Sequence, residues 1–159
     1  ILSFRHEKNK SVGYATNSAL RIASGKYVIK VDGDDFIDRN MIFVMSKILD
    51  NNEDIGFVYG DHMIINKDEE IKYPIDTLDK LLDNGAGIMF RKKYIDSLGG
   101  YSDKYRTRDD YEMVSRYLKN FDGYHLRLPY YNYFQREDSL SKQTTERIME
   151  KKQIDEYYK

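Results

Sequence analysis

Three aspartates stand close together after a short apolar run in the first quarter of the chain. Asp32, Asp34 and Asp35 follow residues 27–31, a segment with few polar side chains that predicts a strand covered on both faces. Carboxylates this close repel one another unless a cation or a proton lies between them. Oxygen ligands of this type suit Mg²⁺ or Mn²⁺, which proteins usually hold together with a substrate's phosphates. The turn therefore predicts metal-assisted chemistry on a phosphorylated substrate, a stronger interpretation than an ordinary polar turn.

Two other metal-dependent motifs share part of this pattern. A calcium-binding EF-hand loop needs glycine at its sixth position and glutamate at its twelfth, but counting from Asp32 puts Ile37 at the sixth. The Asp-x-Asp spacing also resembles that of haloacid-dehalogenase-like phosphatases, which have Thr or Val two residues after the second aspartate. Phe36 stands there instead. The EF-hand is therefore excluded, and the phosphatase stays as a weaker alternative.

A second acidic pair, Asp109 and Asp110, stands where a helix is expected to begin. The helix dipole stabilises acidic residues at a helix N-terminus by roughly 0.3–1 kcal/mol, so this pair alone needs no functional explanation. The three histidines, His6, His62 and His125, have no spacing typical of metal ligands. The sequence also has no motif for Ser-His-Asp catalysis.

The composition excludes several classes of protein. The 159 residues suffice for one domain with a core of its own. A formal net charge of -1 without a basic stripe argues against nucleic acid as a partner. The chain has no cysteine, which excludes disulfides and thiolate metal sites. No apolar stretch approaches the ~20 residues that a membrane span needs.

The acidic residues must be positioned by the strands and helices around them. Periodicity and stop signals predict helices at residues 11–24, 39–49 (capped by Asp38), 78–82, 92–98, 109–120 and 144–158. Strands are expected at residues 1–5, 27–31, 55–65, 88–91, 124–128 and 130–134, with a loop or hairpin tip at 67–73. The last helix is polar, and we expect it at the periphery. Alternating strands and helices predict an α/β fold with a largely parallel sheet.

Several motifs, in this order, resemble those of glycosyltransferase family 2. Three lie in the first part of the chain, at residues 9–17, 23–28 and 31–35, the last containing the acidic turn. Four more follow at residues 87–91, 98–101, 108–112 and 133–141. The resemblance implies the GT-A fold, a Rossmann-like, mixed, mainly parallel sheet with flanking helices. Residues 1–141 would form a partial domain of this fold, followed by a helical extension over residues 142–159.

The same resemblance implies an inverting glycosyltransferase that moves a sugar from a nucleotide-diphosphate sugar to a hydroxyl of a saccharide or other acceptor. Mg²⁺ or Mn²⁺ would bind at Asp34 and Asp35, with Asp32 facing the donor's ribose or sharing the metal. Asp110 would be the general base, with Asp109 as a helper or a helix cap. The implied setting is polysaccharide or glycoconjugate synthesis, in the cytoplasm and peripherally at the membrane.

The chain departs from the family pattern at three motif positions. Thr16 stands where the family usually has arginine, and Asp109 replaces the first acid of a Glu-Asp pair. In the segment that closes the site, Arg136 stands where a histidine is common. We expect Arg136 to pair with the donor's diphosphate instead.

The family's opening strands, which hold the base and ribose of the nucleotide, have no counterpart before Ile1. An N-terminally incomplete sheet leaves an open edge that invites pairing with another chain, so we expect self-association into a homo-oligomer. Two further alternatives stay open at this point. The chain could be a non-catalytic remnant that binds a metal or a partner, or a nucleotidyltransferase-like enzyme, which also places acids after a strand.

Overall fold

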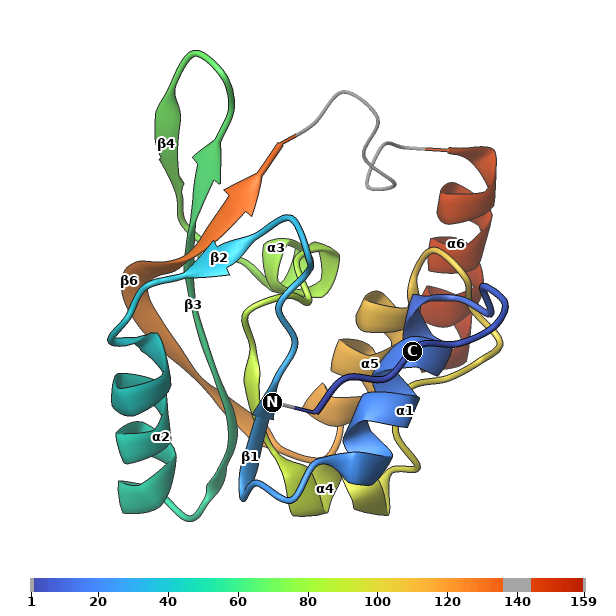
Figure 1. The fold of residues 1–159 in the computed structure, drawn as a ribbon, viewed down its shortest axis with the longest axis horizontal. Coiled ribbons are helices and arrows are strands. Elements are labelled where there is room, and N and C mark those ends of the chain that lie inside the picture. Colours follow the sequence, from blue (N-terminus) through green and yellow to red (C-terminus); the bar gives the residue numbers. More distant parts are fainter. Residues whose placement is uncertain (1, 136–143, 159) are drawn as a thin grey trace.

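The computed structural model describes residues 2–135 and 144–158. Its strands are β1 (Tyr27–Ile29), β2 (Phe36–Ile37), β3 (Ile55–Ile65), β4 (Glu70–Tyr73), β5 (Met89–Arg91) and β6 (Asp122–Phe134). Its helices are α1 (Val12–Ile22), α2 (Met41–Asn51), α3 (Leu78–Asp83), α4 (Lys92–Ser97), α5 (Asp109–Leu118) and α6 (Thr145–Tyr158). The strands form one sheet in the order β1-β5-β3-β6-β2, with β4 added on β3 (Figure 1). Among the described residues, no helix combines the length and apolar character needed to cross a membrane.

The strand directions correct the expectation of a mainly parallel sheet. β3 and β6 pair in parallel, from Ile55 opposite Asp122 to Ile65 opposite Phe134. The other pairs between described strands are antiparallel: β1 with β5, β3 with β5, β3 with β4, and β2 with β6. The α/β sheet is therefore mixed, as expected, but not mainly parallel. The alternation of strands and helices along the chain does not determine the directions of the strands here. β5 follows the short helix α3 and inserts between β1 and β3, antiparallel to both.

Helices cover both faces of the sheet, and each face has its own hydrophobic core (Figure 1). On one face, Met41, Met45 and Leu49 of α2 pack in a cluster with Val58 of β3. On the other face, the adjacent residue Phe57 packs in a cluster with residues of α1, α3, α4, α5 and α6. Neighbouring residues of β3 thus point to opposite faces, as strand geometry requires.

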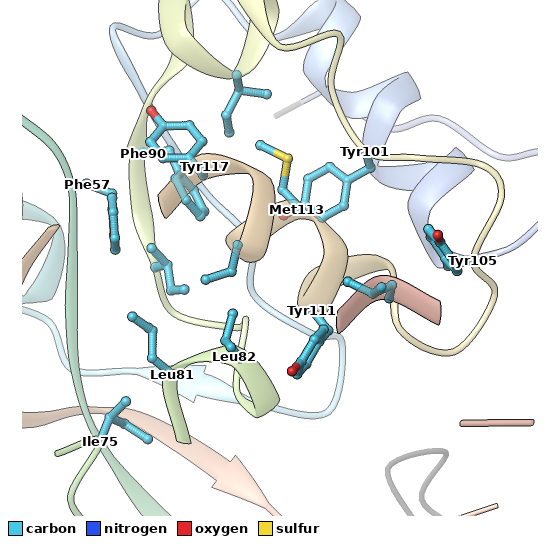
Figure 2. Packing of buried hydrophobic residues seen from close by; sticks show 14 of the residues in the cluster. Phe57, Ile75, Leu81, Leu82, Phe90, Tyr101, Tyr105, Tyr111, Met113 and Tyr117 are labelled. Carbon is cyan, nitrogen blue, oxygen red and sulfur yellow. The ribbon is translucent and has the colours of Figure 1, made fainter. Parts of the chain in front are cut away.

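The larger of the two cores is rich in aromatic side chains, several of which Figure 2 shows around α5. Tyr117 of α5 is fully buried and meets Phe57 edge-on, with ring centroids 5.6 Å apart. Ile154 of α6 is fully buried in the same core. Burying an aliphatic side chain of this size stabilises a fold by about 1.5–3 kcal/mol. The expectation that the last helix is peripheral is therefore wrong, because α6 contributes to the core.

Most predicted helices and strands are confirmed with shifted ends. The helix expected at residues 11–24 is α1, and Ser11 caps it by accepting a hydrogen bond from the amide of Tyr14. The strand expected at residues 27–31 is confirmed as the shorter β1. α2 begins at Met41, with Asn40 rather than Asp38 at the N-cap position. Asp38 instead accepts a hydrogen bond from the amide of Asn40 in the turn before the helix (2.7 Å).

Three expectations about strands are corrected. Residues 2–5 form no strand, and the side chains of Leu2 and Phe4 are largely exposed. Residues 124–128 and 130–134 belong to a single strand, β6, which continues through Pro129. The proline is accommodated because it stands opposite Asp61, where the register of the β3–β6 pair shifts. β4 forms in part of the segment expected to be a loop or hairpin tip, and the two-residue strand β2 was not expected.

Candidate active site

The acidic turn between β1 and β2 is held in place by the end of β6. The Tyr131 hydroxyl donates a hydrogen bond to Asp35 Oδ2 (2.6 Å) and accepts one from the amide of Asp32 (3.2 Å). The amide of Phe134 donates to the other carboxylate oxygen of Asp35 (2.8 Å). Within the turn, the amide of Asp35 donates to the carbonyl of Asp32 (3.1 Å). Strand β6 therefore fixes both the backbone of the turn and one of its three carboxylates.

The three carboxylates of the turn differ in their surroundings. Asp34 is exposed, whereas Asp32 and Asp35 are half-buried. Burial raises the pKa of Asp35, and the charges of Asp32 and Asp34 add to this, against the opposing hydrogen bonds from β6. A cation bound here would relieve the repulsion among the three groups.

Lys30 connects the acidic turn to the second acidic pair. Its ammonium group lies 2.9 Å from Asp32 Oδ1 and 2.7 Å from Asp110 Oδ2, and its side chain is only 12 % exposed. Burial lowers the pKa of Lys30, but Asp110 and Asp32 outweigh this effect, so that the pKa lies above its ordinary value. Asp32 and Asp110, far apart in the sequence, thus share one buried cation. The structure therefore brings together the two acidic groups that the family resemblance assigned to one site.

Asp110 lies in the first turn of α5 with one carboxylate oxygen on Lys30 and the other buried beside Tyr101. Lys30 binds its Oδ2, while its Oδ1 is buried and has no hydrogen-bond partner among the described residues. Gly85 packs directly against it, because a Cβ at position 85 would lie 2.4 Å from the Asp110 Cβ. Tyr101 is buried nearby, and its pKa is raised by burial and by Asp110. A buried acceptor without a partner is costly, and a bound donor such as a hydroxyl group would satisfy it.

Asp109 differs from a solvent-exposed helix cap. It is buried, and its Oδ2 also lacks a hydrogen-bond partner in the described part of the chain. Burial raises the pKa of Asp109 to about 7, and the charge of Asp110 acts in the same direction while Lys30 opposes it. Gly13 of α1 lies close by, since a Cβ there would be 3.3 Å from the Asp109 Cβ. Burial and the charge of Asp110 therefore both favour the protonated form of Asp109.

The loop before α5 is attached to α1 by a reciprocal pair of hydrogen bonds. Asn17 Nδ2 donates to the carbonyl of Tyr101 (2.8 Å), and the amide of Tyr101 donates to Asn17 Oδ1 (2.8 Å). Gly100 has a φ of 76°, and a Cβ there would come within 2.6 Å of Asn17 Oδ1, so only glycine fits. Arg116 of α5 donates to the Gly100 carbonyl (2.5 Å). The motif at residues 98–101 is thereby joined to both α1 and α5.

A cavity of about 690 Å³ lies between α1 and β1. Lys30, Asp32, Gly33 and Tyr101 line it together with mostly apolar residues of α1 and β1. β1 is the end strand of the described sheet, so its outer edge has no strand partner among the described residues. A ligand in this cavity would contact both an apolar wall and the charged groups of Lys30 and Asp32.

The oxygen atoms of the acidic turn fit a hard divalent cation, although they do not form a complete cage. In residues 2–135 and 144–158, no three His, Cys, Asp or Glu side chains converge to enclose a metal ion. Mg²⁺ is usually held by one or two carboxylates, with waters and substrate phosphates as the other ligands. Asp34, which is exposed, and the half-buried Asp32 and Asp35 can supply such carboxylates. These residues therefore suit a metal that arrives with a phosphorylated ligand.

Two residues mark the limits of the sequence prediction for this site. Arg136, which we expected to pair with a diphosphate, lies outside the described residues. Lys30 was not predicted, although a lysine inside an otherwise apolar strand was the signal that could have identified it.

The histidines make separate contacts: His6 with Ser18, His125 with Asp61, and His62 with the ring of Tyr131.

The family model described as Glycosyl transferase family 2 matches residues 1–157. Among curated proteins, the UDP-Glc:alpha-D-GlcNAc-diphosphoundecaprenol beta-1,3-glucosyltransferase WfgD of Escherichia coli is 31% identical over 121 residues. The uncharacterized glycosyltransferase MJ1057 of Methanocaldococcus jannaschii is 26% identical over 132 residues. These matches cover 72% and 76% of this chain but 47% and 45% of the relatives, so the chain spans less than half of their length.

Solved structures of other proteins share the fold. TarS of S. aureus (residues 1–349), in complex with UDP-GlcNAc, matches with a TM-score of 0.70 at 19% identity, over 88% of this chain and 44% of that chain. The mannosyltransferase PcManGT of Pyrobaculum calidifontis, in complex with GDP-Man and Mn2+, matches with a TM-score of 0.62 at 18% identity, over 84% and 39%. The mixed sheet, its flanking helices and a family match over nearly the whole chain support one assignment. This chain belongs to glycosyltransferase family 2 and has the GT-A fold.

Proposed function

We propose that this domain is an inverting glycosyltransferase that moves a sugar from a nucleotide-diphosphate sugar to an acceptor hydroxyl with the help of Mg²⁺ or Mn²⁺. The observation that carries the proposal is the Lys30 bridge, because it holds Asp32 of the acidic turn and Asp110 of α5 in one site. Sugar transfer needs oxygen ligands near the leaving group and a base near the acceptor. Membership of the family supports the same conclusion.

On the donor side, Asp32, Asp34 and Asp35 would hold the divalent cation together with the donor's diphosphate. When bound, such a cation stabilises the negative charge that grows on the leaving diphosphate. Tyr131 donates to Asp35 and thereby keeps one carboxylate oriented before any ligand binds. Arg136 is proposed to pair with the diphosphate.

On the acceptor side, Asp110 takes the proton of the acceptor hydroxyl as that oxygen attacks the anomeric carbon. Its Oδ1, which is buried and has no partner among the described residues, can accept the hydroxyl's hydrogen bond. Lys30 holds the other oxygen at 2.7 Å and so orients the carboxylate. Attack from the face opposite the leaving diphosphate inverts the anomeric configuration. Because an aspartate is a weak base, accurate positioning must supply much of the rate.

The names of related proteins guide the choice of donor. The name of WfgD includes UDP-Glc, TarS was solved with UDP-GlcNAc, and PcManGT was solved with GDP-Man and Mn2+. We therefore propose a UDP-sugar as the donor, with GDP-mannose as the comparison. The proposed acceptor is a hydroxyl of a saccharide in polysaccharide or glycoconjugate synthesis.

A second candidate function is a binding module that retains donor or metal affinity without turnover. The observation that favours it is the position of Lys30, whose ammonium group already pairs with both Asp32 and Asp110 without any metal. The two candidates differ in one measurable property, namely whether UDP is released from a bound UDP-sugar.

The test begins with calorimetry on the complete natural protein, using UDP-glucose, UDP-GlcNAc and GDP-mannose with and without Mn²⁺. A metal-dependent affinity for one of these donors is expected. No binding of any donor would remove the enzyme, and no binding of Mn²⁺ alone as well would remove the binding module. Release of UDP or GDP from the bound donor, with water or a saccharide as acceptor, then distinguishes the enzyme from the binding module.

Two substitutions test the assigned roles. Asp110→Asn should abolish release while sparing donor affinity, and retained turnover would refute Asp110 as the base. Asp34→Ala should weaken donor affinity only when metal is present. Asp54→Asn is the matched control, because Asp54 is an exposed acid in the turn before β3; it should leave both properties unchanged.

A further inference from the structure

α6 holds the segment that leads into Asp109 and Asp110. Glu150 of α6 accepts hydrogen bonds from the amides of Arg106 and Thr107, both at 2.9 Å, one on each carboxylate oxygen. The Thr107 hydroxyl donates to the same carboxylate at 2.6 Å. Burial alone would raise the pKa of Glu150, but these hydrogen bonds outweigh it and lower the pKa. Glu150 is therefore an ionised group whose charge-assisted hydrogen bonds fix two consecutive amides.

Thr107 is engaged by α6 through every hydrogen-bonding group that it has. Besides the contacts with Glu150, its carbonyl accepts a hydrogen bond from Arg147 (2.5 Å). Arg108, the next residue, is buried and donates to the carbonyl of Arg147 (3.3 Å) while pairing with Asp83 (2.5 Å). The backbone of residues 106–108 thus has little freedom to move relative to α6.

Two further contacts join α6 to the body of α5. The Tyr111 hydroxyl donates to Asp155 (2.7 Å), and the Tyr158 hydroxyl donates to Glu112. Tyr111 is buried in the larger core, which Figure 2 shows, and Ile154 lies in the same core. α6 therefore packs along α5 as well as holding the segment in front of it.

The first turn of α5 has no side-chain cap of its own. Arg108 occupies the N-cap position without a capping hydrogen bond from its side chain. The N-cap position of a helix is usually occupied by Ser, Thr, Asp or Asn, whose side chains accept hydrogen bonds from the first amides of the helix. In this chain the start of α5, and with it Asp110, is held from outside by α6.

We propose that Glu150 is a positioning residue for the general base, acting through Thr107 and the first turn of α5 to set the location of Asp110. This inference rests on the proposed function, since it assigns Glu150 a purpose in the same reaction. A displacement of about 1 Å in a reacting group can cost about a hundredfold in rate. Loosening the segment should therefore slow the chemical step before it affects donor binding.

The test compares Glu150→Gln with Glu156→Gln in the complete natural protein. Both substitutions remove one negative charge from α6, but Glu156 is exposed, whereas Glu150 meets three donors. In E150Q the side-chain NH₂ group replaces one carboxylate oxygen. Because NH₂ cannot accept a hydrogen bond, at least one of the donors in residues 106–107 loses its acceptor. We expect the rate of UDP release from the bound UDP-sugar, per folded molecule, to fall between about tenfold and a hundredfold, with donor affinity unchanged. E156Q should match the wild type.

Thr107 supplies a second, independent variant. Thr107→Val removes the hydroxyl that donates to Glu150 at 2.6 Å, and Thr107→Ser keeps it. We expect T107V to slow release and T107S to restore it. Wild-type release rates in E150Q and T107V would overturn the proposal. Loss of donor affinity in parallel with loss of rate would also overturn it, because that result indicates a general structural role.

A measurement that needs no turnover separates this proposal from the proposed function. Amide hydrogen exchange over residues 106–112 should be faster in E150Q than in E156Q, with no change in α2. If the wild-type protein binds no nucleotide sugar, the proposed function fails, and unaltered exchange at 106–112 would independently refute the positioning role.

Discussion

Gly85→Ala should impair catalysis without altering any carboxylate. Gly85 is buried against Asp110, and its backbone is not in the left-handed region, so alanine is conformationally allowed there. The obstacle is space. The added Cβ would lie 2.4 Å from the Asp110 Cβ and 3.0 Å from its Cγ, where ordinary contacts begin at 3.4 Å.

The size of the effect follows from this overlap. Either residue 85 or Asp110 must move by about 1 Å, and a shift of that size at a reacting group can cost about a hundredfold in rate. A hundredfold loss corresponds to about 2.7 kcal/mol of transition-state stabilisation. The overpacking itself should lower the free energy of unfolding by about 1–3 kcal/mol. Donor affinity should hold, because the three heavy atoms nearest to the added Cβ all belong to Asp110 and none to the acidic turn.

Gly56→Ala is the matched control for this prediction. Its added Cβ would also lie 2.4 Å from a neighbouring Cβ, but the neighbour is Phe121, away from the acidic residues. Release of UDP per folded molecule is the quantity to compare, with the folded fraction taken from urea unfolding. We expect G56A to be destabilised yet fully active per folded molecule, and G85A to lose activity. Equal activities per folded molecule in the two variants would refute the assigned role of Asp110.

Three further predictions concern charge and assembly. Lys30→Met leaves Asp32 and Asp110 without their shared cation, so the metal-free protein should lose about 1–3 kcal/mol in urea unfolding. This range is below the 3–5 kcal/mol of a fully buried pair because both acids are partly exposed, and an unchanged midpoint would contradict it. The pKa of Asp109, raised to about 7, means that the folded state holds this proton more tightly than the unfolded chain. Its contribution to stability should be complete below about pH 4 and disappear as the pH rises to about 7, and Asp109→Asn should remove that slope in metal-free unfolding curves. The outer edge of β1, which pairs with no strand among the described residues, predicts self-association; light scattering at high concentration tests this, and a strictly monomeric species would contradict it.

The features that the sequence predicted correctly are those set by neighbouring residues. Ser11 and the spacing of apolar residues specified α1, and the acidic first turn specified the start of α5 at Asp109. Strand β1 and the turn after it were also visible, because an apolar run was followed by turn-forming residues. Only the family resemblance, however, indicated that Asp32 and Asp110 belong to one site.

The features that the sequence did not reveal depend on contacts between distant segments. The sequence around Lys30 does not distinguish it from other lysines in strands, because its partner Asp110 is 80 residues away in the chain. The direction of β5 depends on its insertion between two strands rather than on its own residues. α6 was expected at the periphery because its attachment uses polar side chains such as Glu150, and hydrophobic periodicity does not record these.

The segment between Tyr101 and Arg106 has its two ends fixed by different helices. Asn17 of α1 holds the backbone of Tyr101, and Glu150 of α6 holds the amide of Arg106. Between them, Asp103 and Lys104 are exposed, whereas Tyr105 is buried in the core. A span with fixed ends and a buried residue inside it tolerates exchange of its exposed side chains far better than a change in length. Substitutions at positions 103 and 104 should therefore leave both anchors in place, whereas a one-residue insertion would release one of them.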